Sequence, residues 1–238
     1  MPADIEGTDV QPCTILSKEL ARLSGVPDAV ADMVVPLGEP SMALASILEG
    51  NPLAEDWIAP LDVPGQCLIS WSGTLGEDLF GDDPRTWMQP GHNAFKTFCD
   101  GLVEGLEHAE RRMLFRPHAR HVLSDPQGSL NFIRGREDQP FGLAVSPTDL
   151  LLPDMLEQLE EHLERILTHL APQADMIFLV DVRPSEDGES MTPAPLGEGV
   201  LPQAQVRELM HAHLPETMPV VVRPSETAAA LKWLDLPA

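Results

Sequence analysis

The sequence contains no tyrosine, only three cysteines and no long hydrophobic run. Without tyrosine, one common catalytic acid is missing and a stacking platform for a sugar ring depends on tryptophan. Trp71, at a predicted strand end, is the best candidate among the tryptophans for such a platform, but a place in the core is the favoured interpretation. Cys13, Cys67 and Cys99 are scattered and odd in number, which argues against a disulfide framework and a paired metal knuckle. This cysteine usage predicts a reducing compartment, and we expect a cytoplasmic protein.

Basic residues are also scarce, with 15 Lys and Arg against 38 Asp and Glu, for a net charge of -23. Such a charge repels a phosphate backbone and an anionic bilayer, so we expect neither nucleic acid nor a membrane as a partner. No apolar run approaches the ~20 residues of a membrane helix, and residues 1–9 lack the order of a signal peptide. A small anionic ligand remains compatible, because counterions screen the overall field over ~8 Å.

Familiar catalytic fingerprints are missing as well. The sequence has no Gly-rich phosphate loop before a helix, no nucleophile elbow and no dinucleotide motif, so we expect no cofactor. His118 and His121 flank Ala119 and Arg120 and are a conceivable chelating pair, but no third ligand follows at a telling spacing. Hydrogen-bonding or surface roles are the favoured interpretation, and we predict no metal site.

The 238 residues, 43% of them hydrophobic, suit one domain, residues 1–238, with a flexible N-terminus at residues 1–10. Brief apolar runs alternate with amphipathic stretches, which is typical of parallel strands joined by crossover helices. The sequence leaves open whether the protein is a homo-oligomer or binds a partner subunit. Strands are predicted at residues 14–16, 33–35, 67–71, 112–115, 141–145, 176–180 and 219–222.

Apolar residues recur at helical spacing over residues 95–109, 156–170 and 206–213. Ser225 is expected to cap a last helix that reaches residue 234. An eighth strand would have to come from the Pro-rich stretch 38–64, in which residues 41–49 are predicted to form a helix. Residues 185–195 are predicted to be an exposed loop without regular structure.

Four segments in fixed order, each at a predicted strand end, occupy the second half of the chain. They read MLFRPH at 113–118, GLAVSPTD at 142–149, IFLVDVR at 177–183 and PLGEGVL at 195–201, the last ahead of VVVR at 220–223. Their order and spacing resemble the xylose-isomerase-like TIM barrels, the sugar phosphate isomerase/epimerase and AP endonuclease family 2 type. The resemblance implies a divergent member with an α/β (β/α)8 TIM barrel, incomplete or degenerate in its N-terminal half.

In that family, two glutamates, an aspartate and a histidine hold a divalent cation, and the glutamates shuttle protons beside a substrate carbonyl. Here Arg116 and Arg223 stand where the glutamates would be, Ser146 replaces the aspartate and Phe178 replaces the histidine. Arginine neither binds a metal nor readily serves as a base at neutral pH. The resemblance therefore implies that the usual metal-dependent mechanism is lost.

The resemblance also places the candidate ligand-binding residues at the C-terminal mouth of the barrel. Two interpretations of the arginines stay open: they grip a carboxylate or phosphate, or they pair internally with the nearby aspartates. Glu198 is interpreted as a ligand contact or as part of a tight glycine turn. The candidates are Arg116, His118, Asp149, Asp181, Arg183, Glu198 and Arg223.

Two functions follow from this reasoning. The favoured one is a non-catalytic or metabolite-binding member of the family that has lost its metal ligands. The alternative is an active isomerase, epimerase or lyase on a small hydroxylated, carbohydrate-like substrate, neutral or anionic.

Overall fold

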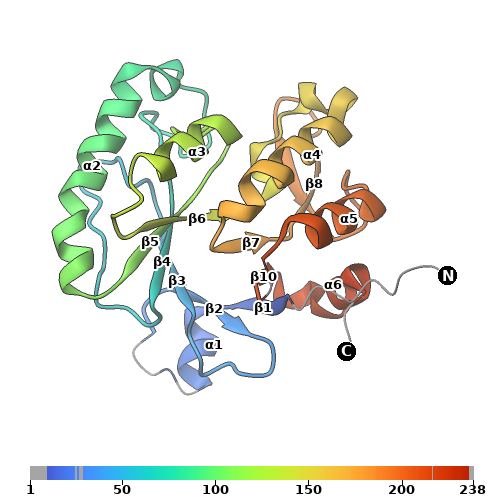
Figure 1. Cartoon of the computed structure of the whole chain (residues 1–238), viewed down its shortest axis with the longest axis horizontal. Helices are drawn as coiled ribbons and strands as arrows, with labels where there is room; N and C mark the ends of the chain where they lie inside the picture. The colour runs from blue at the N-terminus through green and yellow to red at the C-terminus, as the bar shows by residue number, and fades with distance from the viewer. Residues whose placement is uncertain (1–9, 25, 27–28, 216, 236–238) are drawn as a thin grey trace.

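The computed structural model describes residues 10–24, 26, 29–215 and 217–235, so nearly all of the predicted N-terminal tail lies outside the described residues. Eight strands close into a barrel in the order β1-β10-β7-β6-β5-β4-β3-β2 (Figure 1). The (β/α)8 TIM barrel fold is thus confirmed, with one strand running against the others. The barrel strands are β1 (Gln11–Leu16), β2 (Asp32–Pro36), β3 (Ala45–Ile47), β4 (Cys67–Trp71), β5 (Arg112–Arg116), β6 (Phe141–Val145), β7 (Met176–Phe178) and β10 (Pro219–Val222).

The second half of the barrel follows the regular pattern of parallel strands and outer helices. Strands β4 to β7, β10 and β1 pair in parallel along the sheet. The middle residues of β5, β6, β7 and β10 are apolar and buried, because helices cover the outer face of the sheet and side chains from the other strands fill the barrel interior. The helices that follow β4, β5, β6, the outer hairpin and β10 are α2 (Gln89–His108), α3 (Pro126–Arg134), α4 (Leu159–Leu170), α5 (Gln203–His213) and α6 (Thr227–Leu234).

The first half departs from that pattern at β2. This strand runs antiparallel to both β1 and β3, with Thr14 opposite Val35 and Met33 opposite Ser46. Among the described residues between β1 and β4, the six-residue α1 (Lys18–Leu23) is the only helix. The expected degeneracy of the N-terminal half is therefore a reversed strand and a thin helical layer, and the ring of strands is still complete.

The eighth strand comes from the stretch in which a helix was predicted, and that prediction was wrong. Ala45 and Ile47 pair with β2 on one edge and with Cys67 and Ile69 of β4 on the other. The Ala- and Leu-rich sequence has good helix propensity, but pairing on both edges and burial of Ala45 and Ser46 outweigh it.

The barrel interior is a packed apolar core with one polar end. At the N-terminal end, Arg112 forms an ion pair with Asp175 beneath Gly142, where a Cβ atom would collide with the Asp175 carboxylate. Above it every barrel strand contributes at least one buried apolar side chain, so the barrel interior is filled by side chains. The contributing residues are Cys13, Val34, Ala45, Ile69, Leu114, Ala144, Met176, Phe178 and Val221.

Two further sequence predictions need correction. Part of the stretch 185–195, which was predicted to be an irregular loop, forms the second strand of an antiparallel hairpin, β8 (Asp181–Pro184) with β9 (Met191–Ala194), while residues 185–190 form the turn between them. Strand β9 was not predicted because it is partly exposed and contains Pro193, and so lacks the apolar pattern of a strand. Ser225 does not cap the last helix, because it lies inside the 3-10 turn Pro224–Glu226 that precedes α6. None of the helices in the described part of the chain is long and apolar enough to cross a membrane.

Candidate ligand-binding site

A pocket of about 490 Å³ lies at the C-terminal mouth of the barrel. Its floor comes from the ends of β4 and β5 and from the 3-10 turn Pro147–Leu150 after β6. Its outer wall comes from the β8–β9 hairpin, which follows β7. The lining residues are Trp71, Asp78, Phe80, Arg116, His118, Arg120, Thr148, Asp149, Leu151, Leu152, Val180, Val182, Ser190, Met191 and Pro193.

Arg116 forms the centre of the pocket floor. Its Nε donates to Asp149 Oδ2 at 2.5 Å, and the two side chains are only 16% and 11% exposed. Its guanidinium carbon lies 4.7 Å from the ring centroid of Trp71 and 4.5 Å from that of Phe178. Burial strengthens both the ion pair and the cation–π contacts. Arg116 is therefore held in place while still lining the pocket.

His118 and His121 belong to an aromatic cluster beside Arg116. Phe80 lies 4.9 Å from the His118 ring and stacks on His121, with 5.5 Å between ring centroids. The backbone N–H of Arg120 donates to His118 Nδ1 at 3.1 Å, which leaves the proton of the neutral ring on Nε2. Burial, aided by the Arg116 and Arg120 charges, lowers the pKa of His118 to about 4.

His121 is fully buried, and its Nε2 lies 2.9 Å from the carbonyl oxygen of Leu79. Burial, reinforced by the neighbouring His118, lowers the pKa of His121 to about 3. Both histidines are thus neutral at pH 7, and neither adds charge to the pocket.

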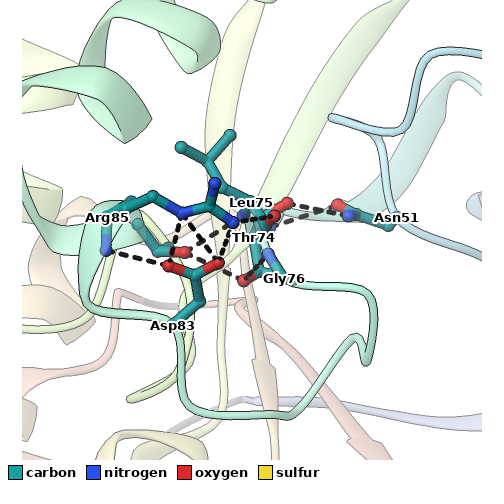
Figure 2. A network of polar contacts seen from close by, with 7 residues as sticks. Asn51, Thr74, Leu75, Gly76, Asp83 and Arg85 are labelled. Carbon is teal, nitrogen blue, oxygen red and sulfur yellow. Dashed lines mark hydrogen bonds and ion pairs between the residues drawn. The ribbon is translucent and has the colours of Figure 1, made fainter.

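The segment after β4 covers one side of the mouth and carries Asp78 and Phe80. Its base is fixed by a network of polar contacts (Figure 2). Asn51 exchanges two hydrogen bonds with the backbone of Thr74, and the Thr86 hydroxyl accepts from the N–H of Leu75 at 3.0 Å. Asp83 pairs with Arg85, whose Nη2 also donates to the carbonyl oxygen of Leu75. The two ends of this segment are therefore anchored, and its middle lies over the pocket.

Asp181, a predicted ligand-binding residue, supports a loop. Its side chain is fully buried and accepts four backbone N–H bonds of 2.9 to 3.1 Å. Gly199 must be glycine here, because a Cβ atom would lie 2.2 Å from Asp181 Oδ1. The motif PLGEGVL is thus folded around this carboxylate, which is not among the groups that line the pocket. The donors are Val182, Gly197, Gly199 and Leu201.

The other predicted residues lie apart from Arg116. Arg223 donates to the carbonyl oxygen of Ala194 in β9 and pairs with Glu226 at 3.1 Å. Arg183 and Glu198 are exposed on the hairpin and on the loop that follows it. The structure therefore brings Arg116, His118 and Asp149 together in one pocket, while Arg223, Asp181, Arg183 and Glu198 are outside its lining. Their role in ligand binding stays a prediction.

The strand ends at Arg116 and Phe178 do not fit the divalent cation that the xylose-isomerase-like barrels hold at this position. A hard cation requires carboxylate or other oxygen ligands, whereas here a guanidinium group lies against a phenyl ring. Ser146, in the aspartate position, is buried with its hydroxyl 3.2 Å from that of Thr148. Among the described residues, no group of three or more His, Cys, Asp or Glu side chains is placed to hold a metal ion.

Several lining residues escaped sequence analysis, above all Asp78, Phe80, Arg120 and Met191. Their only common signal is that they follow a strand or belong to the hairpin that was predicted to be irregular. Arg120 stands between two histidines that were considered for other reasons. Its Nη1 pairs with Asp82 at 2.7 Å, and its Nη2 lies 3.5 Å from the carbonyl oxygen of Glu189.

Comparisons with known proteins identify the fold of the chain. No protein-family model matches the sequence, and neither does any curated protein. Among solved structures, a D-tagatose 3-epimerase-like protein is 12% identical, with a TM-score of 0.54 over 84% of this chain and 80% of that one. The probable 3-DHS dehydratase AsbF from Bacillus anthracis is 8% identical, with a TM-score of 0.52 over 73% of this chain and 65% of that one.

A xylose isomerase-like TIM barrel protein from Mycobacterium smegmatis, solved with magnesium, is 12% identical, with a TM-score of 0.47 over 71% of this chain. The chain spans 61% of the length of that protein, so it is shorter than several of the structures that it matches. The fold implied by the sequence resemblance is confirmed: the chain has the TIM barrel fold of the xylose isomerase-like and sugar epimerase-like proteins.

Proposed function

We propose that this protein binds a small, hydroxylated metabolite at the barrel mouth and does not carry out the metal-dependent isomerisation associated with its fold. The observation that carries the proposal is the position of Arg116. Its guanidinium group lies between two aromatic rings and beside Asp149, in a pocket large enough for a sugar-sized molecule. This cation replaces the positive charge that a metal would supply, and it offers hydrogen-bond donors to ligand oxygens.

The composition of the pocket supports the same proposal. Arg116, His118, Thr148 and Asp149 provide polar groups along one side, and the hairpin and neighbouring loop provide apolar side chains such as Met191 along the other. A molecule with hydroxyl groups on one face and carbon atoms on the other suits such a lining. We further propose that the protein acts in the cytoplasm, on the basis of its three unpaired cysteines.

The test measures binding and turnover separately. Purified protein is titrated with D-fructose, D-ribose, gluconate and D-ribose 5-phosphate, with EDTA or with Mg²⁺ or Mn²⁺, and binding is followed by ligand-observed NMR. Exchange of substrate C–H protons in deuterated water reports isomerase chemistry. We expect metal-independent binding without exchange. Arg116→Met should weaken binding, whereas Arg165→Gln, on the exposed side of α4, should not. Metal-dependent proton exchange would instead establish an active isomerase or epimerase and overturn the proposal.

A further inference from the structure

Arg116 and Arg120 both line the pocket, yet their partners differ in exposure. Asp149, which pairs with Arg116, is 11% exposed and itself part of the lining. Asp82, which pairs with Arg120, is 61% exposed and lies outside the lining. An ion pair with an exposed partner is weak because water and salt compete for both charges. Arg120 is therefore the arginine whose present partner is more readily exchanged.

The position of Arg120 links the two segments that cover the mouth. Its Nη1 bonds Asp82 in the segment after β4, and its Nη2 reaches the Glu189 carbonyl oxygen in the turn of the β8–β9 hairpin. Its side chain is 20% exposed, and its own backbone N–H is used by His118 Nδ1. The backbone of Arg120 is thus fixed, while its guanidinium group lies between the pocket and its covering segments.

The charges in the pocket show what this guanidinium group would bind. Arg116 is balanced by Asp149 at 2.5 Å, and His118 is neutral. The other carboxylate that lines the pocket, Asp78, is exposed and accepts the backbone N–H of Phe80. If Arg120 released Asp82, its guanidinium group would therefore face the pocket without its present ion-pair partner. A carboxylate or phosphate group matches the planar fork of a guanidinium group through two parallel hydrogen bonds.

We propose that Arg120 determines ligand specificity by exchanging Asp82 for an acidic oxygen group, a carboxylate or a phosphate, on the bound metabolite. This inference rests on the proposed function and narrows it to hydroxylated acids. Arg116 then contacts the hydroxylated part of the ligand and keeps its pairing with Asp149. The exchange also frees the segment around Asp82 from one of its contacts.

Two substitutions with opposite expected effects test the exchange. Arg120→Gln removes the charge that binds the anion, so affinity for D-ribose 5-phosphate should fall by about 10- to 100-fold. Asp82→Asn removes the competing carboxylate, so the same affinity should rise several-fold. Both changes break the contact between Arg120 and Asp82, and a purely structural role would therefore shift affinity in the same direction for both. Arg165→Gln is the control and should change nothing.

Direct observation uses protein labelled with ¹⁵N at arginine, titrated at low salt with inorganic phosphate and, separately, with acetate. The Arg120 side-chain signal, assigned by its loss in Arg120→Gln, should shift and saturate, and the two anions show which acidic group is preferred. A shift confined to Arg116, or no saturable shift, would refute the exchange. If D-ribose binds as tightly as its 5-phosphate and neither substitution alters binding, the proposed function stands and this inference fails.

Discussion

Replacing Asp181 should have a large effect on stability, because its one buried carboxylate accepts hydrogen bonds from four backbone N–H groups. In Asp181→Asn the side chain keeps its shape, but one acceptor oxygen becomes an NH₂ group that faces backbone N–H groups. Each carboxylate oxygen accepts two of the four bonds. The substitution therefore removes two charge-assisted bonds, each worth about 1.5–3 kcal/mol.

Part of this loss is recovered, because Gly197 is exposed and its N–H can bond water once the loop relaxes. We therefore expect the free energy of unfolding to fall by about 3 kcal/mol, which corresponds to about 6–12 °C in Tm for a domain of this size. Urea unfolding followed by far-UV circular dichroism measures this change. Glu198→Gln, an exposed change in the same loop, is the matched control and should leave the unfolding midpoint where it is.

A loss below about 1 kcal/mol for Asp181→Asn would mean that the loop does not depend on the carboxylate. An equal loss for Glu198→Gln would mean that the loop responds to charge in general. Either result would contradict the structural role that we infer for the Asp181 carboxylate.

Three further predictions concern groups in or under the pocket. The free energy of unfolding should decrease in acid, because His118 and His121 have pKa values lowered to about 4 and 3 in the folded protein. The same histidines in the unfolded chain take up protons from about pH 6.5 downward, so the loss of stability should reach about 2 kcal/mol per histidine at pH 5. Urea midpoints between pH 7.5 and 4.5 measure this loss, and a flat profile would show that the rings are solvated. Arg116→Glu places a carboxylate beside Asp149 and over two ring faces, so it should lower Tm more than Arg116→Met does; the reverse order would contradict the ion pair. Burial raises the pKa of the Cys13 thiol to about 12, so Ellman's reagent should label Cys13 only after unfolding. Mass spectrometry identifies the labelled cysteine, and rapid labelling of Cys13 in the folded protein would show that the barrel interior is open.

Strands buried on both faces were predictable because their apolar runs are continuous. β5, β6 and β10 lie within a residue or so of their expected bounds, since covering helices and a filled interior leave no room for polar side chains. The direction of a strand, in contrast, could not be predicted from its apolar run. The apolar run of β2 is compatible with either direction, and only the pairing with β1 and β3 reveals that it is reversed.

Short elements that depend on their partners were the least predictable. β3 has three residues within a sequence of high helix propensity, so its pairing with two strands determines its conformation. The β8–β9 hairpin is partly exposed and contains Pro193, and therefore lacks the alternation that usually marks a strand.

The candidate site was predictable where it depends on strand ends. Arg116, His118 and Asp149 meet in one pocket because the ends of neighbouring parallel strands lie together. Of the two interpretations of Arg116 that the sequence left open, the structure shows the internal pairing with Asp149. Binding of a carboxylate or phosphate by Arg116, which lines the pocket, stays a prediction. Arg120 was missed because its contacts, Asp82 and Glu189, belong to loops that no periodic pattern places near it.

The residues at positions 116 and 178 depend on each other. A guanidinium group at position 116 needs a counter-charge, which Asp149 supplies, and a face to lie on, which Phe178 and Trp71 supply. A histidine at position 178 would bring a basic ring to the same guanidinium group, and a carboxylate at position 116 would face Asp149 with no cation between them. Either change alone would therefore disrupt a packed ion pair, and for this reason we regard Arg116, Asp149 and Phe178 as one coupled arrangement.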